Sequence, residues 1–178
     1  MMATETNLTS AVKANVIAFP ARAPLVGGRQ LHFLFSVRQV VDVLKQVEFQ
    51  SITSNQPYIH GIAKWRGRVV PVICLEKCLG LRIVKNGMPP RTIVIRGAKQ
   101  CDSGDVKDLY AICELGAAVH QYQLPIACKP ITPPKKLPGI DFLKGIYAMD
   151  EYLFMVVNIE GILAEFNIGD IKEAARAI

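Results

Sequence analysis

Cysteine and histidine are the residue types in this sequence best suited to nucleophilic chemistry or metal binding. The chain of 178 residues has five cysteines, at positions 74, 78, 101, 113 and 128, and three histidines, at positions 32, 60 and 120. No two cysteines form a CxxC pair, and the histidines lie far in sequence from Cys74 and Cys78, so the spacing does not favour zinc. An odd number of unpaired cysteines fits a reducing cytosol, and we therefore expect a cytoplasmic protein.

The motifs that assemble common catalytic or cofactor sites are absent. No GxxxxGK[ST] or GxGxxG follows an apolar run, and neither GxSxG nor HExxH occurs. We therefore expect no catalytic residues, no cofactor and no metal, and the sequence favours a binding protein. The alternative is an enzyme of unrecognised type with Cys74 or Cys78 as nucleophile. Since Cys74 lies in an apolar run, we interpret it as a small buried hydrophobe instead.

The net charge of +6 is unevenly distributed. Between His60 and Lys99 nine basic residues face one acid, Glu76, whereas seven acids outnumber three bases from Asp141 onwards. A confined basic block indicates an acidic patch on a partner; the simpler alternative is a solvated rim. A second hypothesis is a nucleic-acid-binding β-barrel that uses the block at residues 60–99. Such barrels present stacking aromatics, and Trp65 is the only aromatic residue in the block, so we expect no nucleic-acid partner.

Short apolar runs separated by Gly, Pro and Asn/Asp clusters predict about seven or eight strands and a mainly β protein. Gly27-Gly28 and Asp150-Glu151 predict tight turns between such runs. Pro71, inside the run RVVPVICL, cannot donate a ladder hydrogen bond and must face an edge or a bulge. No apolar run approaches the roughly 18 residues of a spanning helix, so we expect no membrane insertion.

Two short helices are also predicted. Apolar residues between positions 37 and 47 recur at spacings of three and four, which predicts one helix. NIEGILAEF predicts a second, with Asn158 as its N-cap. The proline-rich stretch 129–139 reads as a stiff connector. We expect a flexible tail over residues 1–13, a domain over 14–165, and a C-terminal helix or tail over 166–178.

The most informative stretch runs from Pro57 to Gly80 and reads PYIHGIAKWRGRVVPVICLEKCLG. It combines a proline, an apolar pair, a glycine-containing strand and Arg-Gly with Val-x-Pro-Val-x-x-Leu and Leu-Gly. This combination resembles the signature of the CheW-like domain of bacterial chemosensory systems. The segments GGRQLHFLFSVRQVVDVLKQV, RTIVIRG and FLKGIYAMDEYLFMVVNIEGIL are similar to other parts of that family, and the resemblance covers roughly residues 14 to 165.

The resemblance implies two packed five-stranded SH3-like β-barrels with one or two short helices. It also implies a non-catalytic adaptor that joins the regulatory domain of a CheA-type histidine kinase to the cytoplasmic tip of a methyl-accepting chemoreceptor. In that family the kinase domain docks barrel to barrel, and the receptor hairpin lies in the groove between the barrels. The protein would then be associated with membrane receptor arrays without entering the membrane.

The resemblance further implies a protein-binding site. Arg66, between Trp65 and Gly67, would lie at a tight turn that aims the guanidinium at a carboxylate of a partner helix. The alternative is that Arg66 pairs with an acid of its own chain to hold the turn. Arginine and tryptophan are typical interface anchors, which favours the binding role. Matching by order along the chain adds four residues to the groove: Val40, Gly61, Ile93 and Val119.

The sequence departs from the family pattern at several positions. Lys64-Trp65-Arg66-Gly67 stands where the family usually has Asn-Leu-Arg-Gly, and Cys74 replaces an aspartate. A tryptophan here looks more like the adaptors of the pilus or twitching-motility branch than those of flagellar chemotaxis. The departures leave the fold prediction intact.

Overall fold

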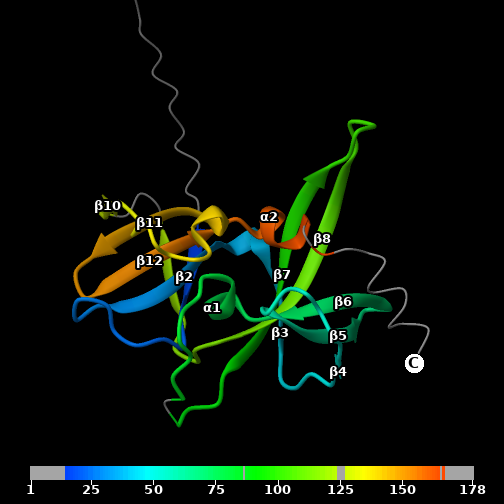
Figure 1. Cartoon of the computed structure of the whole chain (residues 1–178), viewed down its shortest axis with the longest axis horizontal. Helices are drawn as coiled ribbons and strands as arrows, with labels where there is room; N and C mark the ends of the chain where they lie inside the picture. Colours follow the sequence, from blue (N-terminus) through cyan, green and yellow to red (C-terminus); the bar gives the residue numbers. More distant parts are fainter. Residues whose placement is uncertain (1–14, 86, 124–126, 165, 167–178) are drawn as a thin grey trace, which may run out of the picture.

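The computed structural model describes residues 15–85, 87–123, 127–164 and 166, which form two six-stranded sheets (Figure 1). Sheet 1 has the order β10-β11-β12-β2-β1-β9 and sheet 2 the order β3-β7-β8-β6-β5-β4. Sheet 1 consists of β10 (Lys129–Ile131), β11 (Leu143–Met149), β12 (Tyr152–Val157), β2 (Gln30–Ser36), β1 (Asn15–Pro20) and β9 (His120–Gln123). Sheet 2 consists of β3 (Val40–Leu44), β7 (Arg91–Gln100), β8 (Val106–Leu115), β6 (Arg68–Ile73), β5 (Ile59–Trp65) and β4 (Gln50–Ser51).

Four short helical segments join the strands: η1 (Val37–Gln39), α1 (Leu75–Cys78), η2 (Ile140–Phe142) and α2 (Ile159–Ala164). The prediction of a mainly β protein with short helices is confirmed. The expected closed, five-stranded barrels are not seen among the described residues, where no pairing joins the two outer strands of either sheet. Very short edge strands, β10 and β4, instead bring each sheet to six strands.

The chain crosses between the sheets twice. It forms β1 and β2 in sheet 1, continues through β3 to β8 in sheet 2, and returns to sheet 1 at β9. There β12 lies parallel to β2, so segments from both ends of the domain share one sheet. A single apolar cluster includes Phe19 and Phe33 of sheet 1 and Ile93 and Ile95 of sheet 2. The two sheets therefore bury a common core.

Several local predictions are confirmed. Gly27 and Gly28 have φ angles of 57° and 77°, values that glycine adopts without steric cost. The turn between β11 and β12 contains Asp150. Asn158 caps α2, since its side-chain oxygen accepts a hydrogen bond from the Gly161 amide at 3.2 Å.

Pro71 lies in a strand with neighbours on both sides, yet its missing N–H breaks no ladder. On one side it is opposite Ile62 of β5. On the other side the parallel pairing with β8 begins only at Val72. Pro71 was predicted to face an edge or a bulge; β6 is an interior strand, and Pro71 lies one residue before its pairing with β8 begins.

The helix expected over residues 37–47 is wrong. Ser36 and Gln39 form a capping box that starts η1, but the helix ends after one turn and β3 follows. The β-branched residues Val40, Val41 and Val43 favour a strand, and pairing of β3 with β7 overrides the helical spacing. The expected connector at 129–139 also begins with strand β10. The tails expected at 1–13 and 167–178 lie outside the described residues.

Candidate functional site

The turn between β5 and β6 presents Trp65 and Arg66, the two residues predicted to be interface anchors. Trp65 ends β5, Arg66 has a φ of 47° and Gly67 has a φ of 74°. Two successive residues with positive φ form the tight turn that the Arg-Gly pair predicted, and glycine takes the second position without strain. The Arg66 side chain is 64% exposed, so its guanidinium lies at the surface.

Asp42 of β3 holds both side chains of the turn. The Trp65 indole N–H donates to Asp42 Oδ2 at 3.2 Å, and Arg66 Nη2 donates to the same oxygen at 3.1 Å. The Arg66 guanidinium also lies 4.8 Å from the centre of the Trp65 ring. The hydrogen bond from Trp65, together with those from the Val43 amide and Arg66, lowers the pKa of the Asp42 carboxyl.

Arg66 thus has an acidic partner within its own chain, which was the alternative left open by the sequence. The ion pair is largely exposed, and such pairs contribute little to stability because solvent screens them. Its main effect is orientation, since a guanidinium fixed by one carboxylate and one ring still presents its other donors to solvent. Sequence analysis missed Asp42 because it lies 24 positions from Arg66.

A broad groove opens beside this turn; we call it the tryptophan groove. It encloses about 710 Å³ between the end of β3, the loop before β4, and β5. Leu44, Val47 and Phe49 provide apolar walls, with Lys64 and Arg66 on the rim. The Phe49 side chain is 44% exposed, so an apolar surface is open to solvent beside the cationic group. This pairing of chemistry suits an amphipathic partner.

The other four residues suggested by order along the chain are more scattered. Gly61 lies under β4, where a Cβ would overlap the Gln50 carbonyl and come within 2.7 Å of Phe49 Cδ2. Val40 is partly buried against the core, and the Ile93 side chain is 0% exposed. Val119 is 38% exposed and precedes β9 in sheet 1. The structure brings Trp65, Arg66 and Gly67 together and places Gly61 beneath the groove wall.

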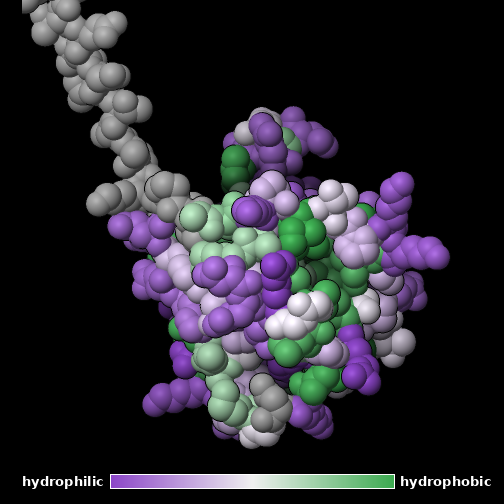
Figure 2. Space-filling model, turned by 90° about the vertical axis from the view of Figure 1, so that its left-hand side faces the viewer, coloured by the Kyte–Doolittle hydropathy of each residue, from purple (hydrophilic) through white to green (hydrophobic). Residues whose placement is uncertain are grey.

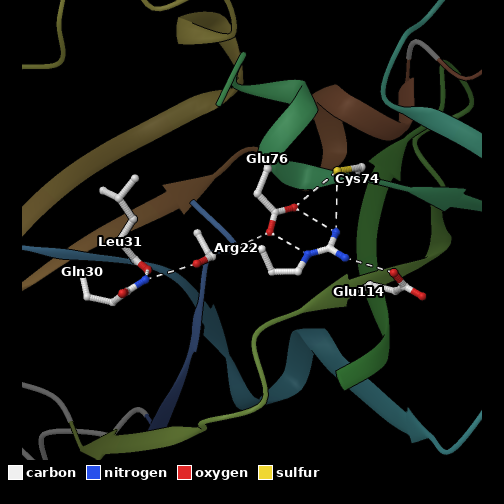
Figure 3. A network of polar contacts seen from close by, with 7 residues as sticks. Arg22, Gln30, Leu31, Cys74, Glu76 and Glu114 are labelled. Carbon is white, nitrogen blue, oxygen red and sulfur yellow. Dashed lines mark hydrogen bonds and ion pairs between the residues drawn. The ribbon is translucent and has the colours of Figure 1, made fainter. Parts of the chain in front are cut away.

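A second polar cluster extends from Glu76 of α1, which is completely buried, to Glu114 of β8, whose side chain is 46% exposed (Figure 3). Its Oε1 accepts hydrogen bonds from the Arg22 backbone amide at 2.8 Å and from Arg22 Nε at 3.2 Å. Arg22 Nη1 also reaches Glu114 Oε2 of β8 at 3.0 Å. The Cys74 thiol donates to Glu76 Oε2 at 3.4 Å. We call these four residues the buried network.

The buried network joins the two sheets and is not arranged for nucleophilic chemistry. Arg22 follows β1 of sheet 1, whereas Glu76 and Glu114 belong to the segment that builds sheet 2. Burial, reinforced by the nearby Glu76 carboxylate, raises the pKa of the Cys74 thiol to about 11. A thiol with such a pKa is almost entirely protonated at neutral pH. The geometry therefore favours a structural role for Cys74 over a catalytic one.

Two histidines belong to an aromatic cluster on sheet 1. The His32 ring lies 4.9 Å from the ring of Tyr152, 6.0 Å from Phe154 and 5.7 Å from His120. His32 is 2% exposed, and burial lowers its pKa.

Among the residues that the structure describes, no group of three His, Cys, Asp or Glu side chains is placed to hold a metal ion. In the same residues, no helix is long and apolar enough to cross a membrane.

These features define a class: a mainly β protein of two sheets that share a core, with an open groove lined by apolar side chains, by Lys64 and Arg66 and by Glu48. A family model for the CheW-like domain matches residues 25–167. The chain therefore belongs to the CheW-like domain family, and the resemblance found at Pro57–Gly80 is confirmed.

A solved structure shares the fold. The scaffolding protein TtCheW from Thermoanaerobacter tengcongensis is 22% identical to this chain, with a TM-score of 0.56. The match covers 83% of this chain and 90% of that chain. No curated protein sequence matches this chain.

Proposed function

We propose that this protein is a cytoplasmic adaptor that couples a CheA-type histidine kinase to chemoreceptors in a bacterial chemosensory array. The observation that carries the proposal is the match of residues 25–167 to the CheW-like domain. The exposed turn at Arg66 and the adjoining tryptophan groove supply a surface on which a second protein can dock.

The tryptophan groove suits the helical tip of a receptor. Apolar side chains of a helix can fill the space between Leu44, Val47 and Phe49, while a carboxylate of the same helix reaches Arg66. Asp42 holds the guanidinium before binding, which reduces the entropy lost when the partner docks. The kinase regulatory domain then binds another face of the two-sheet body. The tryptophan at position 65 keeps the pilus or twitching-motility branch as the predicted setting.

The test is a binding titration of the purified protein against the regulatory domain of its cognate kinase and against a receptor tip fragment. Arg66→Glu is expected to weaken binding to the receptor fragment at least about tenfold, which corresponds to about 1.4 kcal/mol. Arg82→Glu is the matched control, since Arg82 is an exposed arginine in the loop after α1. Circular dichroism checks that both variants remain folded.

Two results would overturn the proposal. The first is wild-type protein that binds neither the kinase domain nor the receptor fragment. The second is wild-type protein that turns over a metabolite without either partner. Equal binding by the wild type and Arg66→Glu would instead remove Arg66 from the interface and leave the adaptor role to be carried by another face.

A further inference from the structure

A second groove, separate from the tryptophan groove, lies on the other side of β6. It encloses about 430 Å³ between β6, the β7–β8 hairpin and the end of α2, and we call it the hairpin groove. Its floor is apolar, formed by Val70, Pro71, Leu109, Leu163 and Phe166. The hairpin projects beyond the rest of sheet 2 (Figure 1), and its tip rises above the body with mainly hydrophilic side chains (Figure 2).

The rim of the hairpin groove is basic and unneutralised. Lys99 and Lys107 lie directly opposite each other in the antiparallel register of β7 and β8, and both are exposed. Like charges in this arrangement destabilise a sheet. Neither lysine forms an ion pair with a described residue, and Arg68 across the groove has only the Tyr110 ring near its guanidinium, at 5.2 Å.

Among the described residues that line the groove, Asp108 is the one acid, and it does not neutralise this rim. Asp108 lies next to Lys107 in sequence, but its Oδ2 is 3.9 Å from Arg96 Nη1. The same oxygen accepts a hydrogen bond from the Tyr110 hydroxyl at 3.3 Å. Three cations, Arg68, Lys99 and Lys107, therefore surround an apolar floor and lack counter-charges among the described residues.

We propose that the hairpin groove is a docking site for an acidic amphipathic segment of another protein. Apolar side chains of such a segment would cover the floor, and its Asp or Glu carboxylates would reach the three cations and relieve the repulsion between the two lysines. This surface lies beyond the adaptor function proposed above and does not depend on it. It gives the protein room for a partner besides the one at the tryptophan groove.

Two other occupants are less favoured. A nucleic acid would use the cations and the rings of Tyr110 and Phe166, but it would leave the aliphatic floor of Val70, Leu109 and Leu163 without apolar partners. Residues 167–178 follow Phe166 directly and contain two acids, Asp170 and Glu173. They also contain two bases, Lys172 and Arg176, so the segment carries no side-chain charge excess to complement the rim.

Fluorescence anisotropy of the full chain with a labelled helical peptide tests the proposal. The probe carries leucines at i, i+3, i+4 and i+7 spacing and glutamates at its other positions, and the matched probe carries lysines in place of glutamates. Wild-type protein is expected to bind the glutamate probe, and Lys107→Glu to weaken this binding at least tenfold. Since that change turns a like-charge pair into an opposite-charge pair, the variant should fold at least as well as the wild type. Lys85→Glu, an exposed site in the loop after α1, is the matched control and should bind like the wild type.

Five results would overturn the proposal. Four of them are absence of binding to the glutamate probe, equal binding by Lys107→Glu and the wild type, equal affinity for the lysine probe, and tighter binding of a single-stranded oligonucleotide. A full-length Asp170→Lys, Glu173→Lys variant tests whether residues 167–178 of the chain itself occupy the groove. If it binds the glutamate probe tenfold more tightly than the wild type, the chain's own segment occupies the groove and the proposal fails; unchanged affinity supports an external partner.

Discussion

At the scale of single residues, Glu76 shows why the interior of this protein contains charge. The carboxylate is fully buried, and Arg22 gives it three hydrogen bonds, at 2.8 Å, 3.2 Å and 3.4 Å. Burying a carboxylate costs several kcal/mol unless a partner compensates it, so the two residues must be retained together. Cys74, which donates to the same carboxylate, completes the set of partners.

The raised pKa of Cys74 predicts that this thiol is inert. When native protein is treated briefly with iodoacetamide at neutral pH, we expect label at Cys101 and Cys128, which are partly exposed, and protection of the buried cysteines 74, 78 and 113. Peptide mass spectrometry measures the label at each position, with urea-unfolded protein as the control. Alkylation of native Cys74 faster than in the unfolded chain would indicate a thiolate and revive the enzyme hypothesis.

Residue-scale prediction from sequence succeeded where the signal was local. The Arg66-Gly67 pair predicted a tight turn because a turn with positive φ has a residue signature of its own. Asp42 and the Arg22–Glu76 pair had no such signature. Arg22 and Glu76 are 54 positions apart, and only the folded chain shows that an arginine and a glutamate meet.

At the scale of elements, sequence patterns located strands better than helices. The β11–β12 hairpin and the cap of α2 were predicted because turn and capping residues lie within a few positions of each other. The prediction of a helix at 37–47 failed because the spacing of the apolar residues was compatible with both a helix and a strand. Pairing of β3 with β7, almost fifty residues later, decided between them.

The burial of His32 in sheet 1 predicts that the stability of the protein decreases at acidic pH. Burial lowers the pKa of His32 below its ordinary 6.5, so the unfolded chain binds more protons than the folded one once the pH falls to that value. The free energy of unfolding should therefore decrease from pH 7 towards pH 5. The rings of Tyr152 and Phe154 of β12 and of His120 of β9 lie beside the His32 ring, and Gln30 O lies 3.3 Å from His32 Nδ1. Tyr122 of β9 packs against Phe154 and His120, and Glu151 is next to Tyr152 in sequence.

Urea denaturation at several pH values measures this effect. His32→Phe is expected to have a shallower fall in unfolding free energy between pH 7 and pH 5 than the wild type. Tyr122→Phe is the control, because it alters the same cluster without removing an imidazole, and its slope should match the wild type. An unchanged slope for His32→Phe would assign the acid sensitivity to other groups.

At the scale of the whole molecule, the common core and the buried network predict that the two sheets unfold together. Trp65, the single tryptophan, reports on sheet 2, and far-UV circular dichroism reports on both sheets. Their urea transitions should coincide. Arg22→Leu, a change in the segment after β1, should lower the unfolding free energy by about 3 kcal/mol in both signals, because it leaves Glu76 buried without its partner.

Arg82→Leu is the control for this experiment and should change the unfolding free energy by less than about 0.5 kcal/mol, as expected for an exposed side chain. If Arg22→Leu moves the dichroism transition and leaves the Trp65 transition in place, the sheets unfold independently and the network does not couple them.

The path of the chain has a consequence for protein engineering. Because β1, β2, β9 and β12 meet in one sheet while the stretch between β2 and β9 builds the other, no single cut yields two halves that each contain a complete sheet. Chimeras with a relative therefore need two crossover points, which exchange the continuous stretch from β3 to β8 that makes up sheet 2, whereas a single recombination point midway along the gene would leave strands of one sheet in different products.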